Sequence, residues 1–225
     1  MISFKNVTVR YPLGNIALNS ISFDIEDGEF VYLVGPSGAG KTTILRLLLD
    51  DIDVNEGSIT VDDFQITAPK FNKSTQLRQK IGIVFQDFKI LLELNVFENI
   101  ALSLLVKGYQ KTLIAKEVTE ALKLTGIEDK KYFFPIQLSA GELQRVAIAR
   151  AVVGDRNIIL ADEPTGNLDP KTTWEVMKIF KKLEKKKTII FATHNSDIVN
   201  SMKRRVIVLN KGTLMKDKKK GGYEL

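Results

Sequence analysis

Apolar and polar positions alternate along residues 2–9 and again along residues 21–25. A period of two places the apolar side chains on one face of a β-strand and leaves the other face to solvent. Asp27 and Gly28 follow the second segment and are typical turn residues. The chain is therefore expected to begin with antiparallel strands that have one buried face.

Continuous apolar runs replace this alternation further along the chain. Residues 30–34 read Phe-Val-Tyr-Leu-Val, as expected of a strand that is buried on both faces in a parallel sheet. Comparable runs, several of them separated by helical patterns, occupy residues 81–85, 158–161, 188–192 and 206–209. Strands that alternate with helices in this way predict an α/β fold with a parallel core sheet and an antiparallel β portion at its N-terminus.

The region between the second and third of these core strands has a helical pattern. Residues 96–107 and 111–124 are expected to form helices, and Gly126 follows the second helix as a typical stop. We therefore expect one domain over residues 1–225. It divides into an α/β core, 1–86 and 155–225, and an inserted helical subdomain at about 87–154.

Composition narrows the class of protein. The chain has 225 residues, of which 44% are hydrophobic and 27% charged, as in a globular domain with a sizeable core. It contains no cysteine and one histidine, which excludes a disulfide framework and a thiolate metal site. No apolar run approaches the roughly 18 residues of a membrane-spanning helix, and the first residues do not resemble an export signal. A cytoplasmic protein is expected.

The net charge of +6 raises the question of a nucleic-acid or anionic membrane partner. The excess is local, because much of it lies in residues 181–187 and 216–220. Solvated charge is the expected explanation, and the lysine- and glycine-rich segment 216–222 is expected to be mobile. Contact of its lysines with anionic lipid headgroups is the alternative.

A phosphate-binding motif follows the strand at residues 30–34. The sequence G-x-x-x-x-G-K-[ST] is present, and an apolar helical segment, 44–49, comes next. Glycines let backbone N–H groups point at a β-phosphate, a lysine adds charge near the β- and γ-phosphates, and a threonine hydroxyl binds Mg²⁺. The motif consists of Gly35, Pro36, Ser37, Gly38, Ala39, Gly40, Lys41 and Thr42.

Further candidate residues stand at the carboxyl ends of the other core strands, where ligands of α/β sheets collect. Asp162 and Glu163 follow 158–161, so that Asp162 is a candidate for the Mg²⁺ side and Glu163 for orienting or deprotonating the attacking water. Gln86 is placed to touch both Mg²⁺ and this water, and His194 to reach the γ-phosphate. Each of the last two, taken singly, fits a structural role as well.

The segment Leu-Ser-Ala-Gly-Glu at residues 138–142, followed by Gln-Arg at 144–145, resembles the L-S-G-G-Q/E signature of the ABC-type ATPases. The resemblance extends over nearly the whole chain. It implies that Tyr11 stacks on adenine, that Thr43 completes the P-loop, and that Asp169 lies in the D-loop. It also implies that Gln86 is the Q-loop glutamine and His194 the switch histidine. Ala140 departs from the family glycine and adds a methyl group beside the γ-phosphate.

The resemblance implies a P-loop NTPase fold with a helical signature subdomain and a homodimer that closes head to tail on ATP and Mg²⁺. The signature precedes a helix expected at residues 142–153, so the hydroxyl of Ser139 and the N–H of Gly141 form a second anion site. The resemblance places Glu142 among the nucleotide-binding residues of the same signature. In ABC-type ATPases this site serves the nucleotide of the partner subunit. ATP hydrolysis then dissolves the dimer, with Glu163, Lys41, Gln86 and His194 acting at the γ-phosphate.

Blocks such as Phe-Pro-Ile-Gln-Leu-Ser at 134–139 and Ala-Asp-Glu-Pro-Thr-Gly-Asn-Leu-Asp at 161–169 narrow the resemblance to the FtsE-type ATPases of cell division. It implies attachment to the inner face of the cell membrane through an integral membrane protein of the FtsX type, and ATP-driven regulation of peptidoglycan hydrolysis. The apolar segment 88–97 is a candidate groove for a short helix of that partner, or else part of the subdomain core.

Other functions remain open at this point. The 161–169 block is shared with ATPase subunits of lipoprotein-release and macrolide-export transporters. A nucleotide-gated binding module that hardly hydrolyses ATP is disfavoured by Glu163. A nucleic-acid-associated ABC ATPase is disfavoured because the chain has no room for a coiled coil or a second cassette. A GTPase is disfavoured because Asn-Lys-Gly-Thr at 210–213 lacks the aspartate of N-K-x-D.

Overall fold

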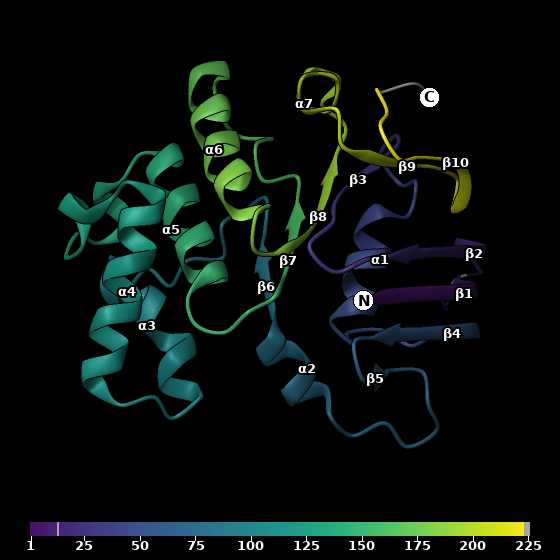
Figure 1. Ribbon diagram of the computed structural model, residues 1–225, viewed down its shortest axis with the longest axis horizontal. Coiled ribbons are helices and arrows are strands. Elements are labelled where there is room, and N and C mark those ends of the chain that lie inside the picture. The colour runs from purple at the N-terminus through teal and green to yellow at the C-terminus, as the bar shows by residue number, and fades with distance from the viewer. Residues whose placement is uncertain (13, 223–225) are drawn as a thin grey trace. The chain divides into compact units, whose positions relative to one another are not determined.

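The computed structural model describes residues 1–12 and 14–222 (Figure 1). The chain divides into two compact units, one formed by Met1–Arg78 with Lys187–Leu225 and the other by Gln79–Lys186. It passes from the first unit into the second within helix α2 (Ser74–Lys80). The predicted boundaries of the helical subdomain, near residues 87 and 154, remain a prediction.

An antiparallel sheet forms part of the first unit, with strands in the order β2-β1-β4-β5. Its strands are β1 (Ile2–Arg10), β2 (Ile16–Ile25), β4 (Glu56–Val61) and β5 (Phe64–Gln65). Phe4 of β1 is paired with Phe23 of β2, and their rings stack with centroids 4.6 Å apart. Alternate residues of β2 are buried along 21–25, which confirms the predicted antiparallel strands with one buried face.

Parallel strands form the rest of this unit's β structure. β3 (Phe30–Val34) is fully buried and pairs in parallel with β8 (Thr188–Thr193) on one side and β9 (Arg205–Asn210) on the other. Helices α1 (Lys41–Leu48) and α7 (Ser196–Met202) follow β3 and β8 along the chain. These are the strand-then-helix units that the apolar runs predict.

The lysine-rich segment near the C-terminus is more ordered than the sequence suggests. β10 (Thr213–Lys218) pairs with β9 in antiparallel register, so residues 216–218 are part of a sheet and the expectation of mobility is wrong for them. Arg205 of β9 binds both carboxylate oxygens of Asp217, at 2.8 and 2.7 Å, and also Glu29 at 2.8 Å. These ion pairs hold β10 against β9 and the start of β3.

The second unit contains two parallel strands and a helical part. The strands are β6 (Ile81–Val84) and β7 (Ile158–Asp162). The helices are α3 (Val96–Val106), α4 (Lys111–Thr125), η1 (Glu128–Lys130), η2 (Pro135–Gln137), α5 (Ala140–Val152) and α6 (Pro170–Leu183). Helices α3, α4 and α5 pack against one another (Figure 1).

Local signals explain where these helices begin and end. α3 starts with a capping box, in which Asn95 and Glu98 satisfy each other's backbone N–H groups. α4 ends at Gly126, whose φ of 68° and N–H bond to Leu122 make it the predicted stop. The observed order of strands and helices confirms the predicted α/β class, the parallel strands and the inserted helices. Within the described residues, no helix is long and apolar enough to span a bilayer.

Candidate functional site

The phosphate-binding loop joins β3 to α1 in the first unit, and two of its glycines are required by geometry. Gly35 has φ 151°, and a Cβ there would lie 2.2 Å from the carbonyl oxygen of Leu209. Gly40 has φ 105°, and a Cβ there would lie 2.8 Å from the carbonyl oxygen of Ala17. Contacts this close exclude a side chain at either position. Only glycine therefore allows the loop backbone to adopt this path.

Lys41 is the first residue of α1, and its side chain folds back over the loop. The residue is 7% exposed, and its ammonium donates to the carbonyl oxygens of Gly35 at 2.7 Å and Pro36 at 3.1 Å. The N-cap of α1 is Gly40, so no N-cap side chain accepts a hydrogen bond from the N–H groups of the first turn. A positive side chain beside the N-terminus of a helix suits an anion such as a phosphate.

Tyr11 and His194 belong to the same unit. The hydroxyl of Tyr11 lies 3.4 Å from Oγ1 of Thr43 in the first turn of α1, so this aromatic ring stands next to the phosphate loop. His194 is exposed and follows β8 directly. The last residues of β3 and β8, Val34 and Thr193, are register partners, and both strands end at the same sheet edge. The first unit thus gathers Tyr11, the phosphate loop and His194.

Asp162, Glu163 and Gln86 belong to the second unit. β6 and β7 are paired as far as Val84 and Ala161, so Gln86 and Asp162 follow the same edge of this strand pair. A Cβ at Gly166 would lie 3.1 Å from the side-chain nitrogen of Gln86 and 3.4 Å from the carbonyl oxygen of Glu163. The second unit therefore gathers a glutamine and two carboxylates, which are oxygen ligands suited to Mg²⁺.

Glu163 has an unusual backbone conformation. Its φ is 46°, in the left-handed region that costs a non-glycine residue about 1–3 kcal/mol. A turn bond from the N–H of Gly166 to the carbonyl oxygen of Glu163, 3.1 Å long, closes the segment that follows. Strained residues cluster at functional sites, and this one is the predicted position of the catalytic carboxylate.

The signature residues form the start of α5 in the second unit. Ser139 is the N-cap, its hydroxyl donates to Glu142 Oε2 at 2.9 Å, and its N–H donates to the same oxygen at 2.8 Å. These bonds hold the pKa of Glu142 below its usual value. The predicted anion-binding serine is thus engaged in a capping box of its own helix, a contact that the sequence reasoning missed although S-x-x-E predicts it.

Gly141 lies against α6, whose N-cap is Asp169. A Cβ at Gly141 would lie 2.4 Å from Cγ2 of Thr172, so α5 and α6 approach closely at this point. Asp169 accepts from the N–H and hydroxyl of Thr172 at 3.0 and 2.5 Å, and these bonds lower its pKa. Thr172 therefore links the signature to the D-loop, and the spacing D-x-x-T was the signal for it.

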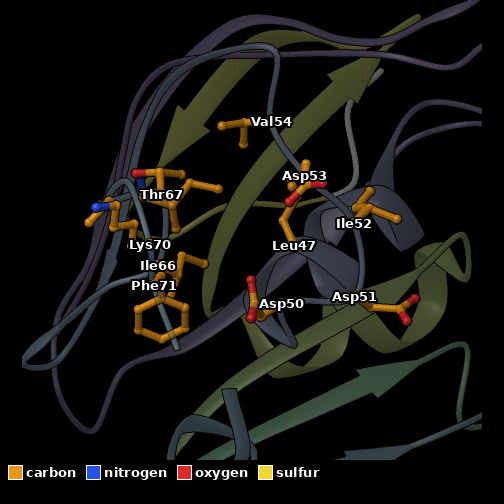
Figure 2. Close-up of a pocket in the computed structure, with 12 residues that line it drawn as sticks. Leu47, Asp50, Asp51, Ile52, Asp53, Val54, Ile66, Thr67, Lys70 and Phe71 are labelled. Atoms are coloured by element: carbon orange, nitrogen blue, oxygen red, sulfur yellow. The ribbon is translucent and has the colours of Figure 1, made fainter. Parts of the chain in front are cut away.

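A cavity of about 540 Å³ in the first unit is lined by none of the predicted site residues (Figure 2). Ile66, Lys70 and Phe71 lie on one side of it and Leu47 and Asp50 on the other (Figure 2). Asp50 accepts a short hydrogen bond from the hydroxyl of Ser74 at this place. The cavity lies at the C-terminal end of α1, whereas the phosphate loop lies at the N-terminal end of this helix. The cavity is therefore separate from the candidate nucleotide site.

Comparison with known proteins identifies the family of this chain. The sequence model of the ABC transporter family matches residues 18–166. The chain belongs to this family, and it is an ABC-type ATPase. Its structure is similar to that of the ATP-binding cassette MJ0796, solved as a dimer in a post-hydrolysis state bound to ADP and Pi. The match covers 99% of this chain and 100% of the cassette, with a TM-score of 0.88 and a sequence identity of 36%.

Within the family, the chain is similar to the cell-division ATP-binding proteins FtsE. It is 47% identical to FtsE of Bacillus subtilis (strain 168) over 224 residues, which cover 99% of this chain and 98% of the relative. It is 38% identical to FtsE of Escherichia coli (strain K12) over 215 residues, which cover 95% and 97%. The similarity therefore extends over essentially the full length of these cell-division proteins.

Proposed function

We propose that the chain is the ATP-hydrolysing subunit of a membrane complex that acts in cell division. It works as a dimer closed by two ATP molecules and drives a conformational change in an integral membrane protein of the FtsX type, which regulates peptidoglycan hydrolysis. Full-length similarity to FtsE proteins at 38–47% identity is the observation that carries this proposal. The phosphate loop supports its enzymatic part.

The nucleotide is held in the first unit. Backbone N–H groups of residues 35–43 and the ammonium of Lys41 bind the phosphates, and Tyr11 stacks on the adenine. The position of Tyr11 beside Thr43 supports this role. The residues present also suit Mg²⁺, with Thr42, Gln86 and Asp162 as its ligands. The ion would neutralise charge on the β- and γ-phosphate oxygens.

Glu163 orients or deprotonates the water that attacks the γ-phosphate. Its left-handed backbone supports this assignment, because backbone strain is retained more often at functional sites than elsewhere. Lys41 stabilises negative charge on the transferred group, and Gln86 and His194 position the water and the γ-phosphate. Hydrolysis yields ADP and phosphate, the ligands bound to the solved cassette of similar fold.

Ser139, Gly141 and Glu142 act on the nucleotide of the partner subunit, together with Asp169 of the D-loop. The dimeric state of the similar cassette supports this arrangement. The hydroxyl of Ser139 has one hydrogen, which it donates to Glu142 in this structure. Binding of a γ-phosphate in trans therefore requires that this hydrogen turn from the carboxylate to the phosphate.

Exposed apolar side chains in the second unit support a protein partner. Leu92 and Val106 are 68% and 74% exposed, and Leu105 is 54% exposed. Leu92 falls within the segment 88–97, the candidate contact with the membrane protein. Attachment to the inner face of the membrane would follow from this contact, because no described helix can span the bilayer.

The test is to purify tagged Glu163→Gln protein from its native membranes with ATP and to identify its partners by mass spectrometry. Removing the base keeps ATP bound and accumulates the closed state. Lys41→Ala, which weakens nucleotide binding, is the matched control. Recovery of an FtsX-type membrane protein with division proteins supports the proposal. Recovery of a permease with a lipoprotein or small-molecule cargo overturns the cell-division role and replaces it with transport.

A further inference from the structure

The backbone that follows Gln86 forms a strained turn. Phe88 and Lys89 have φ values of 60° and 49°, so two consecutive non-glycine residues are left-handed. This conformation is uncommon for any side chain and an outlier for a bulky one such as phenylalanine. Strain of this kind persists only where surrounding contacts hold the backbone in place.

Arg150 supplies these contacts. One guanidinium nitrogen donates to the carbonyl oxygen of Lys89 at 2.6 Å and the other to that of Phe88 at 2.8 Å. Arg150 reaches the two carbonyls through two separate nitrogens of one planar group, an arrangement that a lysine, with a single ammonium nitrogen on a flexible stem, does not reproduce. Burial lowers the pKa of Arg150, so the charge is kept in a partly desolvated place.

Arg150 stands on the helix that carries the signature. α5 begins after Ser139, and Arg150 follows eleven positions later, about 16 Å along the helix axis at 1.5 Å per residue. The helix is firmly packed at this end, because a Cβ at Gly82 of β6 would lie 1.9 Å from the carbonyl oxygen of Ala151. On the other side, the amide of Asn167 donates to the carbonyl oxygen of Gln86 at 3.1 Å.

We propose that Arg150 is a positioning residue that ties the backbone after Gln86 to the signature helix. Through this tie, the place of the Gln86 side chain and the place of Ser139 are fixed by one rigid element. The inference rests on the proposed function for the role of Gln86 in hydrolysis. The tie itself rests on the two hydrogen bonds and the strained turn.

The test compares Arg150→Lys with Arg156→Lys. Arg156 is a matched control, because it is also a half-buried arginine that donates to backbone carbonyls at the end of α5, those of Arg150 and Ala151. Steady-state ATPase kinetics, ATP binding and amide hydrogen exchange are measured on the full chain. The melting temperature of each variant shows how much of any effect is loss of stability.

Arg150→Lys is expected to speed amide exchange at residues 87–90 and to lower kcat about 10- to 100-fold, the effect of misplacing a reacting group by about 1 Å. The dissociation constant for ATP is expected to stay within about threefold, because the phosphate loop is unchanged. Arg156→Lys is expected to leave exchange at 87–90 unchanged and kcat within about twofold, because Arg156 donates to carbonyls of α5 and the bonds to Phe88 and Lys89 come from Arg150. Unchanged exchange, or faster exchange with unchanged kcat, overturns the proposal.

A double variant tests whether Arg150 acts through Gln86. If it does, Arg150→Lys combined with Gln86→Ala has the kcat of Gln86→Ala alone, because the second change removes a group that is already lost. Losses in kcat that multiply show independent action and overturn the proposal. If the wild-type chain hydrolyses no ATP, the proposed function fails, and the exchange comparison by itself still decides whether Arg150 holds the turn.

Discussion

At the residue scale, the hydroxyl of Ser139 has an observed use as a helix cap and a proposed use in binding phosphate. Ser139 accepts from the N–H of Glu142 and donates to its carboxylate, so the cap stabilises the start of α5. Under the proposed function, a phosphate that arrives in trans would compete with Glu142 for the same hydrogen. Nucleotide binding at the start of α5 would then exchange one hydrogen bond of Ser139 for another.

The pKa of Glu142 reports this contact. Hydrogen bonds from Ser139 lower it, and Ser139→Ala removes the hydroxyl donor while the backbone N–H remains. We expect the pKa of Glu142 to rise part of the way to its ordinary value of 4.5. Carboxyl chemical shifts followed by NMR as a function of pH measure this change.

The sign of the accompanying stability effect follows by linkage. A folded pKa below the ordinary value contributes stability above pH 4.5 that is lost as the pH falls through the folded pKa. In Ser139→Ala the pKa of Glu142 is shifted less, so the variant should lose less unfolding free energy than the wild-type chain as the pH falls below 4.5. Asp169 is the control, because its lowered pKa depends on Thr172 and should not move. An unchanged pKa of Glu142 in the variant would contradict the capping contact.

Glycine at position 141 shows how far residue types can be predicted. The sequence predicts that Gly141 is a signature residue beside a phosphate, and the structure adds that a Cβ at this position would meet the methyl group of Thr172. That second requirement lies thirty-one positions away in the chain, and nothing in the local pattern announces it. Local motifs predict the chemistry of a residue, whereas long-range packing partners need the fold.

At the element scale, Gly141 sets the approach of α5 to α6. Gly141→Ala places a Cβ 2.4 Å from Cγ2 of Thr172, and overpacking of this kind costs about 1–3 kcal/mol. Thr172→Ser removes that methyl group and keeps the hydroxyl that binds Asp169. The double variant Gly141→Ala, Thr172→Ser should therefore regain most of the lost stability. Midpoints of urea unfolding measure all four chains, and additive losses would rule out the steric explanation.

The stability of β10 depends on the ion pairs of Arg205. Arg205 has a side chain that is 13% exposed and bonds to Asp217 and Glu29. Arg205→Gln should cost about 1–3 kcal/mol of unfolding free energy, the range for hydrogen bonds to charged groups. Amide exchange along β10 should also become faster. The measurement is urea unfolding together with residue-resolved exchange.

Arg10→Gln is the control for this prediction. Arg10 forms an ion pair with Glu56 in which the two side chains are 47% and 59% exposed. Exposed pairs contribute about 0–1 kcal/mol, so this variant should change stability little. An equal loss in both variants would show that the burial of Arg205 is unimportant. Faster exchange in β10 only for Arg205→Gln would tie the effect to that strand.

The same strand explains an error of the sequence analysis. Lysines and glycines at 216–222 favour a mobile segment by composition, and β10 has little buried surface. Pairing with β9 and the Asp217 contact to Arg205 decide its structure instead. The core strands, by contrast, can be predicted from the sequence, because a short continuous apolar run is typical of a strand that is buried on both faces.

At the scale of the whole molecule, the phosphate loop makes stability depend on nucleotide. A ligand that binds only the folded chain stabilises it by about 2.7 kcal/mol at one hundred times its dissociation constant. ATP with Mg²⁺ should therefore raise the melting temperature of the wild-type chain. Lys41→Ala removes the ammonium that folds over the loop, and its melting temperature should respond far less at the same ATP concentration. Calorimetric scans with and without ATP measure this difference.

Under the proposed function, dimer formation is the larger consequence of nucleotide binding. Each chain carries one phosphate loop and one signature, so closure on two ATP molecules should produce a particle of twice the 25.3 kDa chain mass. Glu163→Gln should accumulate this dimer, because ATP stays intact once the base is gone. Light scattering with excess ATP measures the mass, and Lys41→Ala with ATP and Glu163→Gln with ADP should both remain monomeric. A Glu163→Gln chain that binds ATP and still scatters as a monomer over a range of protein concentrations would contradict closure of the isolated subunit.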